Sequence, residues 1–304
     1  VEKVKNIDSL LRLINRLEKN YCSKSDLIIS IGGGTILDVT GFVASVFMRG
    51  IDLVMIPTTL MGQADASSAG KTCINGKNTK NLLGTLYMPK YVYNNIEILK
   101  TSSEHSFRQG MSEMFKYGLL GSKKLLNLLD NYSVKPNNTT MVSILKETVK
   151  VRIRLRKIDP LVSNLGHTFG HAFETESKNK VAHGDAISVG ILFSLKLSVD
   201  KGYISNKLFY KIFHLMQKLK LNVKIDASIN LEKIIEFMKR DKKSDGNRIG
   251  FVLLKSIGNI NLNCRDGFTF LKPTYVKLFM KNYISKENMR TKNHWNNLLK
   301  NKIC

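Results

Sequence analysis

The segment from residue 27 to residue 59 has the pattern of a β-strand, a tight turn, an α-helix and a second β-strand. Residues 27–31 and 53–56 are short apolar runs that predict buried strands, and residues 35–48 have apolar positions at helical spacing. The glycine triplet 32–34 predicts the turn between the first strand and the helix. A strand–helix–strand unit implies parallel strands, because the helix carries the chain back to the starting end of the sheet. We therefore predict an α/β domain with a parallel sheet.

Helical patterns dominate the rest of the chain. Residues 8–19 predict a helix before this unit, and residues 91–93 predict one more short strand after it. Beyond residue 105 the apolar residues recur mainly at helical spacing. The helices predicted there span residues 106–129, 139–157, 164–178, 184–200 and 205–220.

The chain divides into three parts on these patterns. Residues 1–104 form the α/β part, with an incomplete sheet, and residues 105–271 form a helical part that ends in a hairpin between 249–254 and 260–262. Residues 272–304 are a basic tail with poor periodicity, and we predict no structure for its last twenty residues.

Composition limits the class of protein. The chain has 304 residues, of which 43% are hydrophobic and 24% charged, as in folded globular proteins. It has no apolar run of about 18 residues and no apolar signal-peptide segment near its start, so we expect a cytoplasmic protein without a membrane partner. Its four cysteines are scattered, which argues against a disulfide framework or a structural zinc ribbon.

The net charge of +24 has three interpretations: nucleic-acid binding, attraction of an anionic substrate, or compositional drift in a lysine-rich sequence. The lysines are spread along the chain and accompany no nucleic-acid motif. We therefore expect no specific nucleic-acid partner.

Three of the six histidines fall within seventeen residues: His167, His171 and His183. A helix would place His167 and His171 on one face, about 5–6 Å apart, and a turn would bring His183 back toward them. Converging imidazoles usually bind a divalent metal or transfer protons near neutral pH. The alternative is that they are solvated or helix-capping residues.

Glu113 lies among Met111, Met114 and Phe115, which indicates a partly buried helix. A buried carboxylate requires a cation, and the histidine cluster could contribute one as a bound metal ion. Two histidines and one carboxylate are a typical catalytic zinc set. The alternative is an exposed ion pair between Glu113 and Lys116.

Polar residues follow both predicted strands at one edge of the sheet. Gly33 and Gly34 could expose backbone N–H groups to a phosphate, Asp38 lies one turn into the helix, and Thr58 and Thr59 end the second strand. Ligands of open α/β sheets bind at this carboxyl edge. A glycine-rich turn without a ligand is the alternative.

Asp65, Lys71, Lys80 and Asn81 follow in a glycine-containing segment that we predict to be a loop. Solvated charges are one interpretation of these residues. We favour a cage for a substrate that carries oxyanions, because two lysines with an amide and a carboxylate lie near the predicted ligand edge.

The order and spacing of these motifs, from about residue 2 to residue 255, resemble those of the 3-dehydroquinate synthase family. The matching residues are Gly32–Gly34, Asp38, Met48–Gly50, Ile56–Thr59, Asp65–Ser68, Gly70–Lys71, Lys80–Asn81, Glu113, Lys116–Gly118, Asn164, Gly166–His167, Gly170–His171 and His183–Gly184. The resemblance implies an α/β NAD-binding domain followed by an α-helical metal and substrate domain.

The resemblance also implies residue roles. Glu113, His167 and His183 would bind Zn²⁺ or Co²⁺. NAD would contact Glu2, Lys5, Gly33, Gly34, Asp38, Thr58 and Thr59. His171, Lys116, Asp65 and Asn164 would be catalytic, and Arg49, Lys71, Lys80, Asn81, Lys150 and Lys243 would bind substrate. Arg49 would reach the neighbouring subunit's site, so a homodimer is implied.

The implied reaction is that of a lyase in the shikimate pathway of aromatic amino acid biosynthesis. It would convert 3-deoxy-D-arabino-heptulosonate 7-phosphate to 3-dehydroquinate and phosphate through transient oxidation by NAD, phosphate elimination, reduction and aldol closure. The alternatives are another sugar-phosphate cyclase, a metal-dependent polyol dehydrogenase and an inactive remnant.

Three departures from the family pattern stand out. The chain begins at the Glu2–Lys5 motif, so we expect the leading strands of the NAD domain to be absent. Residues 150–163 are shorter than in the family, and Pro160 stands where an arginine would recognise the substrate carboxylate, so Arg156 is the candidate to compensate. Asp185 replaces a glutamate.

Overall fold

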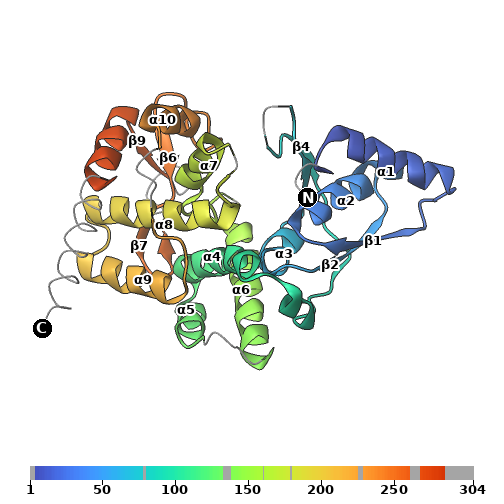
Figure 1. Cartoon of the computed structure of the whole chain (residues 1–304), viewed down its shortest axis with the longest axis horizontal. Helices are drawn as coiled ribbons and strands as arrows, with labels where there is room; N and C mark the ends of the chain where they lie inside the picture. The colour runs from blue at the N-terminus through green and yellow to red at the C-terminus, as the bar shows by residue number, and fades with distance from the viewer. Residues whose placement is uncertain are drawn as a thin grey trace, which may run out of the picture. The chain divides into compact units, whose positions relative to one another are not determined.

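The computed structural model describes residues 4–77, 80–132, 138–159, 161–178, 180–224, 229–260 and 268–284. The chain divides into two compact units (Figure 1). The first comprises Val1–Gly118 and Lys124–Ile153, and the second comprises Leu119–Lys123 and Arg154–Cys304.

A parallel sheet lies at the centre of the first unit. Its strand order is β1 (Leu27–Gly32), β2 (Asp52–Pro57) and β5 (Tyr91–Val92), and both pairings are parallel. Helix α2 (Gly34–Val46) connects β1 to β2 and packs against both strands. The predicted strand–helix–strand unit and the short strand near residue 91 are therefore confirmed.

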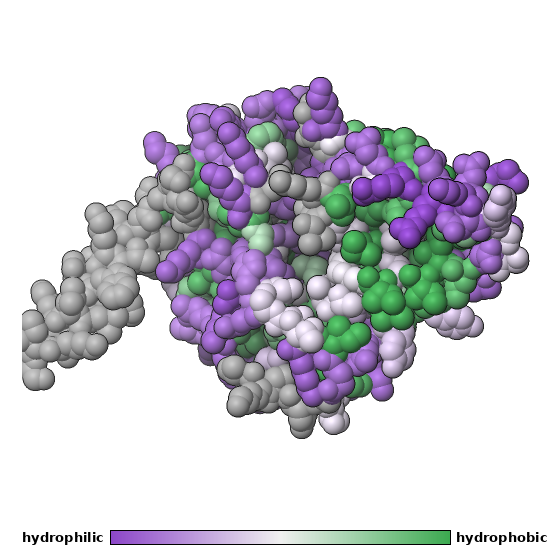
Figure 2. All heavy atoms as spheres, turned by 45° about the vertical axis from the view of Figure 1, so that its right-hand side comes forward, coloured by the Kyte–Doolittle hydropathy of each residue, from purple (hydrophilic) through white to green (hydrophobic). Residues whose placement is uncertain are grey.

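Strand β1 is less buried than we predicted. Leu27, Ile29 and Ile31 are 50%, 54% and 60% exposed, so the prediction of a buried strand is wrong for one of its two faces. Successive side chains of a strand point to opposite faces. The other face packs on α1 (Ile7–Lys19) and α2 through Ile28. Figure 2, in which the right-hand side of Figure 1 is turned forward, shows hydrophobic residues on the surface of the first unit.

The segment predicted to be a loop after Asp65 contains a hairpin instead. Strand β3 (Lys71–Ile74) pairs antiparallel with β4 (Leu83–Leu86), which begins two residues after Asn81. The short helix α3 (Leu60–Ala64) and the 3₁₀ helices η2 (Phe47–Arg49), η3 (Ala66–Ser68) and η4 (Glu97–Thr101) were also not predicted. These elements are five residues or fewer, too short to establish a periodicity.

Three helices follow the α/β part. The predicted helix 106–129 is two helices, α4 (Glu104–Gly121) and α5 (Lys123–Asp130), separated at Ser122. Helix α6 (Asn138–Ile158) matches its prediction.

The second unit is mainly helical, and its described residues also include short strands. Its helices include α7 (His167–Glu176), α8 (His183–Asp200), α9 (Asn206–Lys218) and α10 (Leu231–Lys239), of which α10 was not predicted. Phe169, Phe173, Phe193 and Phe251 form part of one buried core between these elements.

The strand pairing of the second unit differs from our prediction. Strand β6 (Ile249–Phe251) pairs with β9 (Thr269–Leu271), whereas β7 (Leu254–Ser256) pairs with β8 (Asn259–Ile260). A single hairpin between 249–254 and 260–262 is therefore wrong, because the first apolar run is divided between two partners.

The beginning of the basic tail is helical. Residues 273–284 form a helix whose Val276, Met280 and Tyr283 are buried. The prediction of poor periodicity is wrong there, because intervening lysines obscure a narrow apolar stripe. The last twenty residues lie outside the described part of the chain.

None of the helices in the described residues is both long and apolar enough to cross a membrane.

Candidate functional site

The glycine turn and the two threonines meet at the carboxyl ends of β1 and β2. The Thr58 N–H donates to the Gly32 carbonyl at 2.9 Å, and Gly33 is the N-cap of α2. Thr59 caps α3 by accepting from the Gly62 N–H at 3.1 Å. A Cβ on Gly33 would lie 3.1 Å from the Thr59 side-chain methyl, a tight contact that glycine avoids. The first N–H groups of α2, from Gly34 on, lie at this edge and suit an anionic ligand.

A polar cluster joins three residues that were predicted to bind NAD or substrate. The buried Lys5 ammonium lies 2.6 Å from the Asp38 carboxylate and 2.5 Å from the Asn81 side-chain oxygen. The Cys73 thiol also donates to Asn81, at 3.2 Å. Burial raises the pKa of Asp38, and the Lys5 charge opposes that shift. Glu2, the other predicted residue of this motif, lies outside the described residues.

A second network surrounds Asp65, the C-cap of α3. The Arg152 Nε group of α6 donates to Asp65 Oδ1 at 2.9 Å, and the Tyr117 hydroxyl donates to the same oxygen at 2.6 Å. Burial by itself would raise the pKa of Asp65, but Arg152, then Lys116, the Tyr117 hydroxyl and Lys71, hold it well below its usual range. Asp65 is therefore an ionised carboxylate at neutral pH.

Lys116 and Glu113 form a buried ion pair on α4. Their side chains are 2% and 1% exposed, and the Lys116 ammonium bonds to Glu113 Oε2. The ammonium also lies 4.3 Å from the centre of the Tyr117 ring. The exposed pair that we considered for these residues is therefore wrong, and the predicted burial of Glu113 is confirmed.

The three clustered histidines converge. Their ring centroids are 5.2 Å apart for His167 and His171, 5.7 Å for His167 and His183, and 6.0 Å for His171 and His183. His167 is the first residue of α7 and His183 is the first residue of α8.

Close packing of two glycines fixes the beginning of α7. A Cβ on Gly190 would lie 2.0 Å from the Gly166 oxygen, and Gly166 has a φ of +79°. Only glycine combines this left-handed backbone with such a close approach. The approach holds His167 against α8.

Hydrogen bonds orient two of the imidazoles. His167 Nδ1 lies 3.1 Å from the Leu165 carbonyl oxygen, and His183 Nδ1 lies 3.2 Å from Glu174 Oε2. A proton on each Nδ1 donates to these oxygens and leaves the Nε2 lone pair as the ligand atom. This tautomer is the one that a histidine bound to metal through Nε2 requires.

Glu113, His167 and His183 form a group that could hold a metal ion. Each residue offers one ligand atom, and the three ligand atoms lie within 4.8 Å of one another. Two imidazole nitrogens and a carboxylate oxygen suit Zn²⁺ or Co²⁺, with a position left for substrate or water. The residues therefore fit the metal that the sequence resemblance implies.

The Glu174 carboxylate allows a test of this orientation. We expect Glu174→Gln to weaken metal binding roughly 10- to 100-fold, because the amide is a poorer acceptor for His183 Nδ1–H. Glu176→Gln, on the same helix, is the control and should leave affinity unchanged. Equal affinities for the Glu174 variant and the wild type, from competition with a chelator, would show that Glu174 does not support the ligand.

His171 belongs to a different set of contacts. Its Nδ1 lies 3.7 Å from Asp241 Oδ2, and Asp241 Oδ1 accepts from the buried Lys243 ammonium at 2.5 Å. Burial lowers the pKa of Lys243, although Asp241 opposes the shift. The nearby sequence-predicted residue Asn164 is buried, and its Nδ2 has no hydrogen-bond partner among the described residues. An unsatisfied buried donor is a candidate for binding a ligand oxygen.

The remaining predicted substrate residues are exposed: Arg49, Lys71, Lys80 and Lys150. Arg49 lies in a strained turn, with φ of +46° at Met48, +62° at Arg49 and +107° at Gly50. The Lys24 ammonium donates to the carbonyls of Met48 and Gly50 and stabilises this turn.

Sequence reasoning missed two residues of the Asp65 network, Arg152 and Tyr117. The resemblance implied Lys150 as a substrate residue and gave Arg152 no role, and on a helix residues two apart face different directions. Thr148, Val151 and Leu155 recur at helical spacing and form the buried face of α6. This spacing places Arg152 beside the buried face and could have identified it.

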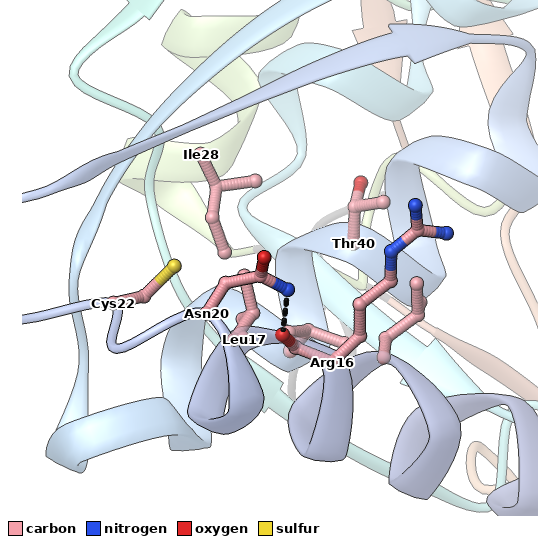
Figure 3. Close-up of a pocket in the computed structure, with 8 residues that line it drawn as sticks. Arg16, Leu17, Asn20, Cys22, Ile28 and Thr40 are labelled. Atoms are coloured by element: carbon pink, nitrogen blue, oxygen red, sulfur yellow. Dashed lines mark hydrogen bonds between the residues drawn. The ribbon is translucent and has the colours of Figure 1, made fainter.

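A separate cavity of about 360 Å³ lies beside α1, β1 and α2 (Figure 3). None of the predicted site residues lines it. Its lining consists of Leu13, Arg16, Leu17, Asn20, Cys22, Ile28, Thr40 and Val43.

Comparison with known proteins identifies relatives along most of the chain. The 3-dehydroquinate synthase N-terminal family model matches residues 1–109, and the C-terminal model matches residues 110–244. The 3-dehydroquinate synthase of Sulfurisphaera tokodaii is 36% identical over 266 residues, which are 83% of this chain and 75% of the relative. That of Helicobacter pylori strain P12 is 35% identical over 266 residues, 84% of this chain and 76% of the relative.

Solved structures share the fold. A 2-deoxy-scyllo-inosose synthase in complex with carbaglucose-6-phosphate, NAD⁺ and Co²⁺ has a TM-score of 0.81 at 22% identity, covering 91% of this chain and 79% of its own. A 2-epi-5-epi-valiolone synthase of Streptomyces hygroscopicus with bound NAD⁺ and Zn²⁺ also has a TM-score of 0.81, at 20% identity, covering 94% and 81%. The predicted fold class, an α/β domain followed by a helical domain, is confirmed.

Proposed function

The chain belongs to the 3-dehydroquinate synthase family, and we propose that it converts 3-deoxy-D-arabino-heptulosonate 7-phosphate to 3-dehydroquinate and phosphate. The observation that carries the proposal is the convergence of Glu113, His167 and His183, in which hydrogen bonds leave Nε2 of both imidazoles as the ligand atom. We place this reaction, a carbon–oxygen bond cleavage that releases phosphate, in the shikimate pathway.

The proposed NAD site is the carboxyl edge of the parallel sheet. The N–H groups at the beginning of α2 would bind the pyrophosphate, since a helix N-terminus attracts negative charge. Asp38 would accept from a ribose hydroxyl, and Lys5 would keep that carboxylate ionised. Thr58 and Thr59 line the same edge. NAD bound there would accept a hydride from the substrate and return it in the same turnover.

Glu113, His167 and His183 would hold Zn²⁺ or Co²⁺. Such an ion, when bound, lowers the pKa of a ligating hydroxyl and polarises a carbonyl oxygen. His171 would lie beside that hydroxyl and exchange its proton, with Asp241 behind the imidazole. Asn164 Nδ2 would donate to a substrate oxygen and so satisfy its own unmet hydrogen bond.

Lysines and arginines would bind the anionic groups of the substrate. Lys116 and the ionised Asp65 would hold the substrate hydroxyls in place, and Lys71, Lys80, Asn81, Lys150, Lys243 and Arg49 would surround its phosphate and carboxylate. Positive groups placed where negative charge develops are typically the largest catalytic contribution of such a site. The elimination of phosphate is the step that this arrangement would accelerate most.

A phosphate-release assay tests the proposed reaction. Purified protein supplied with NAD and Zn²⁺ should release phosphate from the heptulosonate phosphate, and omission of either should stop the release. A metal-dependent polyol dehydrogenase would instead accumulate NADH with glycerol or a related polyol. No phosphate from folded protein that contains metal and NAD would contradict the proposed activity.

We also propose that the protein acts as a homodimer in which Arg49 completes the neighbouring site. Co-expression of Arg49→Gln with His171→Ala should then restore roughly a quarter of wild-type activity, because half of the dimers are mixed and each mixed dimer has one intact site. Each variant alone should be inactive, and a mixture no more active than the separate variants would contradict a shared site.

A further inference from the structure

We infer that Arg152 is the residue that binds an anionic group of the substrate and selects for it, an inference that rests on the proposed function. The residue was not among the predicted site residues, and Lys150 and Arg156 of the same helix are exposed. Arg152 is the arginine of α6 that reaches the ionised Asp65.

The contacts of Arg152 fix one part of its guanidinium. Nε–H is shared between Asp65 Oδ1 at 2.9 Å and the Tyr117 oxygen at 3.0 Å, and Nη1 donates to Ser68 Oγ at 2.5 Å. These partners come from the segment after β2 and from α4. A guanidinium held by three separate residues has a defined orientation before any ligand binds, so little entropy is lost when one does.

The other end of the guanidinium remains available. Among the described residues Nη2 has no hydrogen-bond partner, and one N–H of Nη1 is also unused. The Arg152 side chain is 11% exposed, and none of its atoms is among the buried polar atoms that lack a partner. Nη2 therefore reaches solvent, and with the unused N–H of Nη1 it forms the paired edge that can bind a carboxylate or phosphate with two parallel hydrogen bonds.

The surrounding charges favour an anion at this edge. Arg152, Lys116 and Lys71 are the cations that act on Asp65, and Glu113 is the second acid of the cluster. Asp38 also interacts with Asp65, but its charge is paired with that of Lys5. The cations therefore outnumber the acids by one, and an incoming anion balances the cluster. Asp65 would then have two functions, to orient Arg152 and to contact the substrate.

Two ligands that each lack one anion identify which group Arg152 binds. Their dissociation constants are measured by calorimetry on protein loaded with NADH and Zn²⁺, because the reduced cofactor cannot start the reaction. The two ligands are heptulosonate, which lacks the phosphate, and heptulose 7-phosphate, which lacks the carboxylate. In Arg152→Gln one of these constants should rise roughly 10- to 100-fold, the loss expected for charged hydrogen bonds, while the other changes less than about twofold. A rise for the first assigns Arg152 to the carboxylate, and a rise for the second assigns it to the phosphate.

Controls separate this role from a structural one. Lys146→Gln, which removes an exposed charge on the same helix, should leave both constants unchanged. Arg152→Lys, which keeps the charge but loses the paired edge, should show an intermediate loss for the same ligand. The melting temperature and NAD affinity of each variant report folding. Equal changes for both ligands, or none for either, would overturn the inference. Because binding is measured without turnover, this result is independent of whether the wild type releases phosphate.

Discussion

Replacing His167, His183 or Glu113 by alanine is expected to weaken Zn²⁺ binding by roughly 100- to 1000-fold, because each removes one of three protein ligands. His171→Ala should keep the metal and lose turnover. The structure explains this contrast. His167, His183 and Glu113 offer ligand atoms within 4.8 Å of one another, whereas the His171 imidazole lies beside the Asp241 carboxylate. Metal content after dialysis against a chelator, measured by mass spectrometry, checks it.

A histidine outside the cluster provides the control for this series. His214→Ala, at an exposed position on α9, should retain both metal and activity. Equal metal loss in His171→Ala and His183→Ala would mean that the roles of these histidines are assigned incorrectly.

Lys116→Met is expected to lower the free energy of unfolding of the metal-free protein by about 3–5 kcal/mol, the usual cost of leaving one member of a buried ion pair without its partner. The pair is almost completely buried, so water cannot replace the lost ammonium. Bound metal would neutralise Glu113 in its place, so the loss should be smaller in the Zn²⁺-loaded protein. Urea unfolding with and without chelator measures both values.

The double variant Lys116→Met/Glu113→Gln distinguishes charge from packing. Removing both charges should recover most of the stability of the metal-free protein, because no unpaired buried charge remains. Lys124→Met, at an exposed position on α5, should change stability by less than about 0.5 kcal/mol. A double variant as unstable as Lys116→Met would show that the methylene packing of Lys116 matters more than its charge.

Long apolar patterns made much of the fold predictable. The strand–glycine–helix–strand unit at residues 27–57 and the helices α6 to α9 follow from hydrophobic periodicity and a glycine turn, which are local signals. The β3–β4 hairpin was missed because its strands have only four residues each, too few to establish an alternating pattern. The pairing of β6 with β9 was missed because the partner strand lies beyond a second hairpin in the sequence. The exposure of Leu27, Ile29 and Ile31 also depends on what covers each face of the sheet, which no local pattern records.

In the candidate site, too, the features set by local sequence could be predicted and those set by distant contacts could not. The approach of His167, His171 and His183 was predictable, since helical spacing and one turn bring them together. The Arg152–Asp65 contact was not, because it joins residues 87 positions apart. The contact depends on the orientation of α6 about its axis, which turns Arg152 inward and leaves Lys150 exposed. The local sequence of α6 does not specify which residue it faces.

We propose that NAD oxidises and then reduces the same substrate carbon in the site of this chain. A heptulosonate 7-phosphate that carries deuterium on the carbon to be oxidised tests it most directly. We expect one phosphate and one 3-dehydroquinate per substrate, with the deuterium retained in the product and no NADH accumulated. Loss of the deuterium to solvent, accumulation of deuterated NADH, or recovery of unreacted substrate would each contradict it.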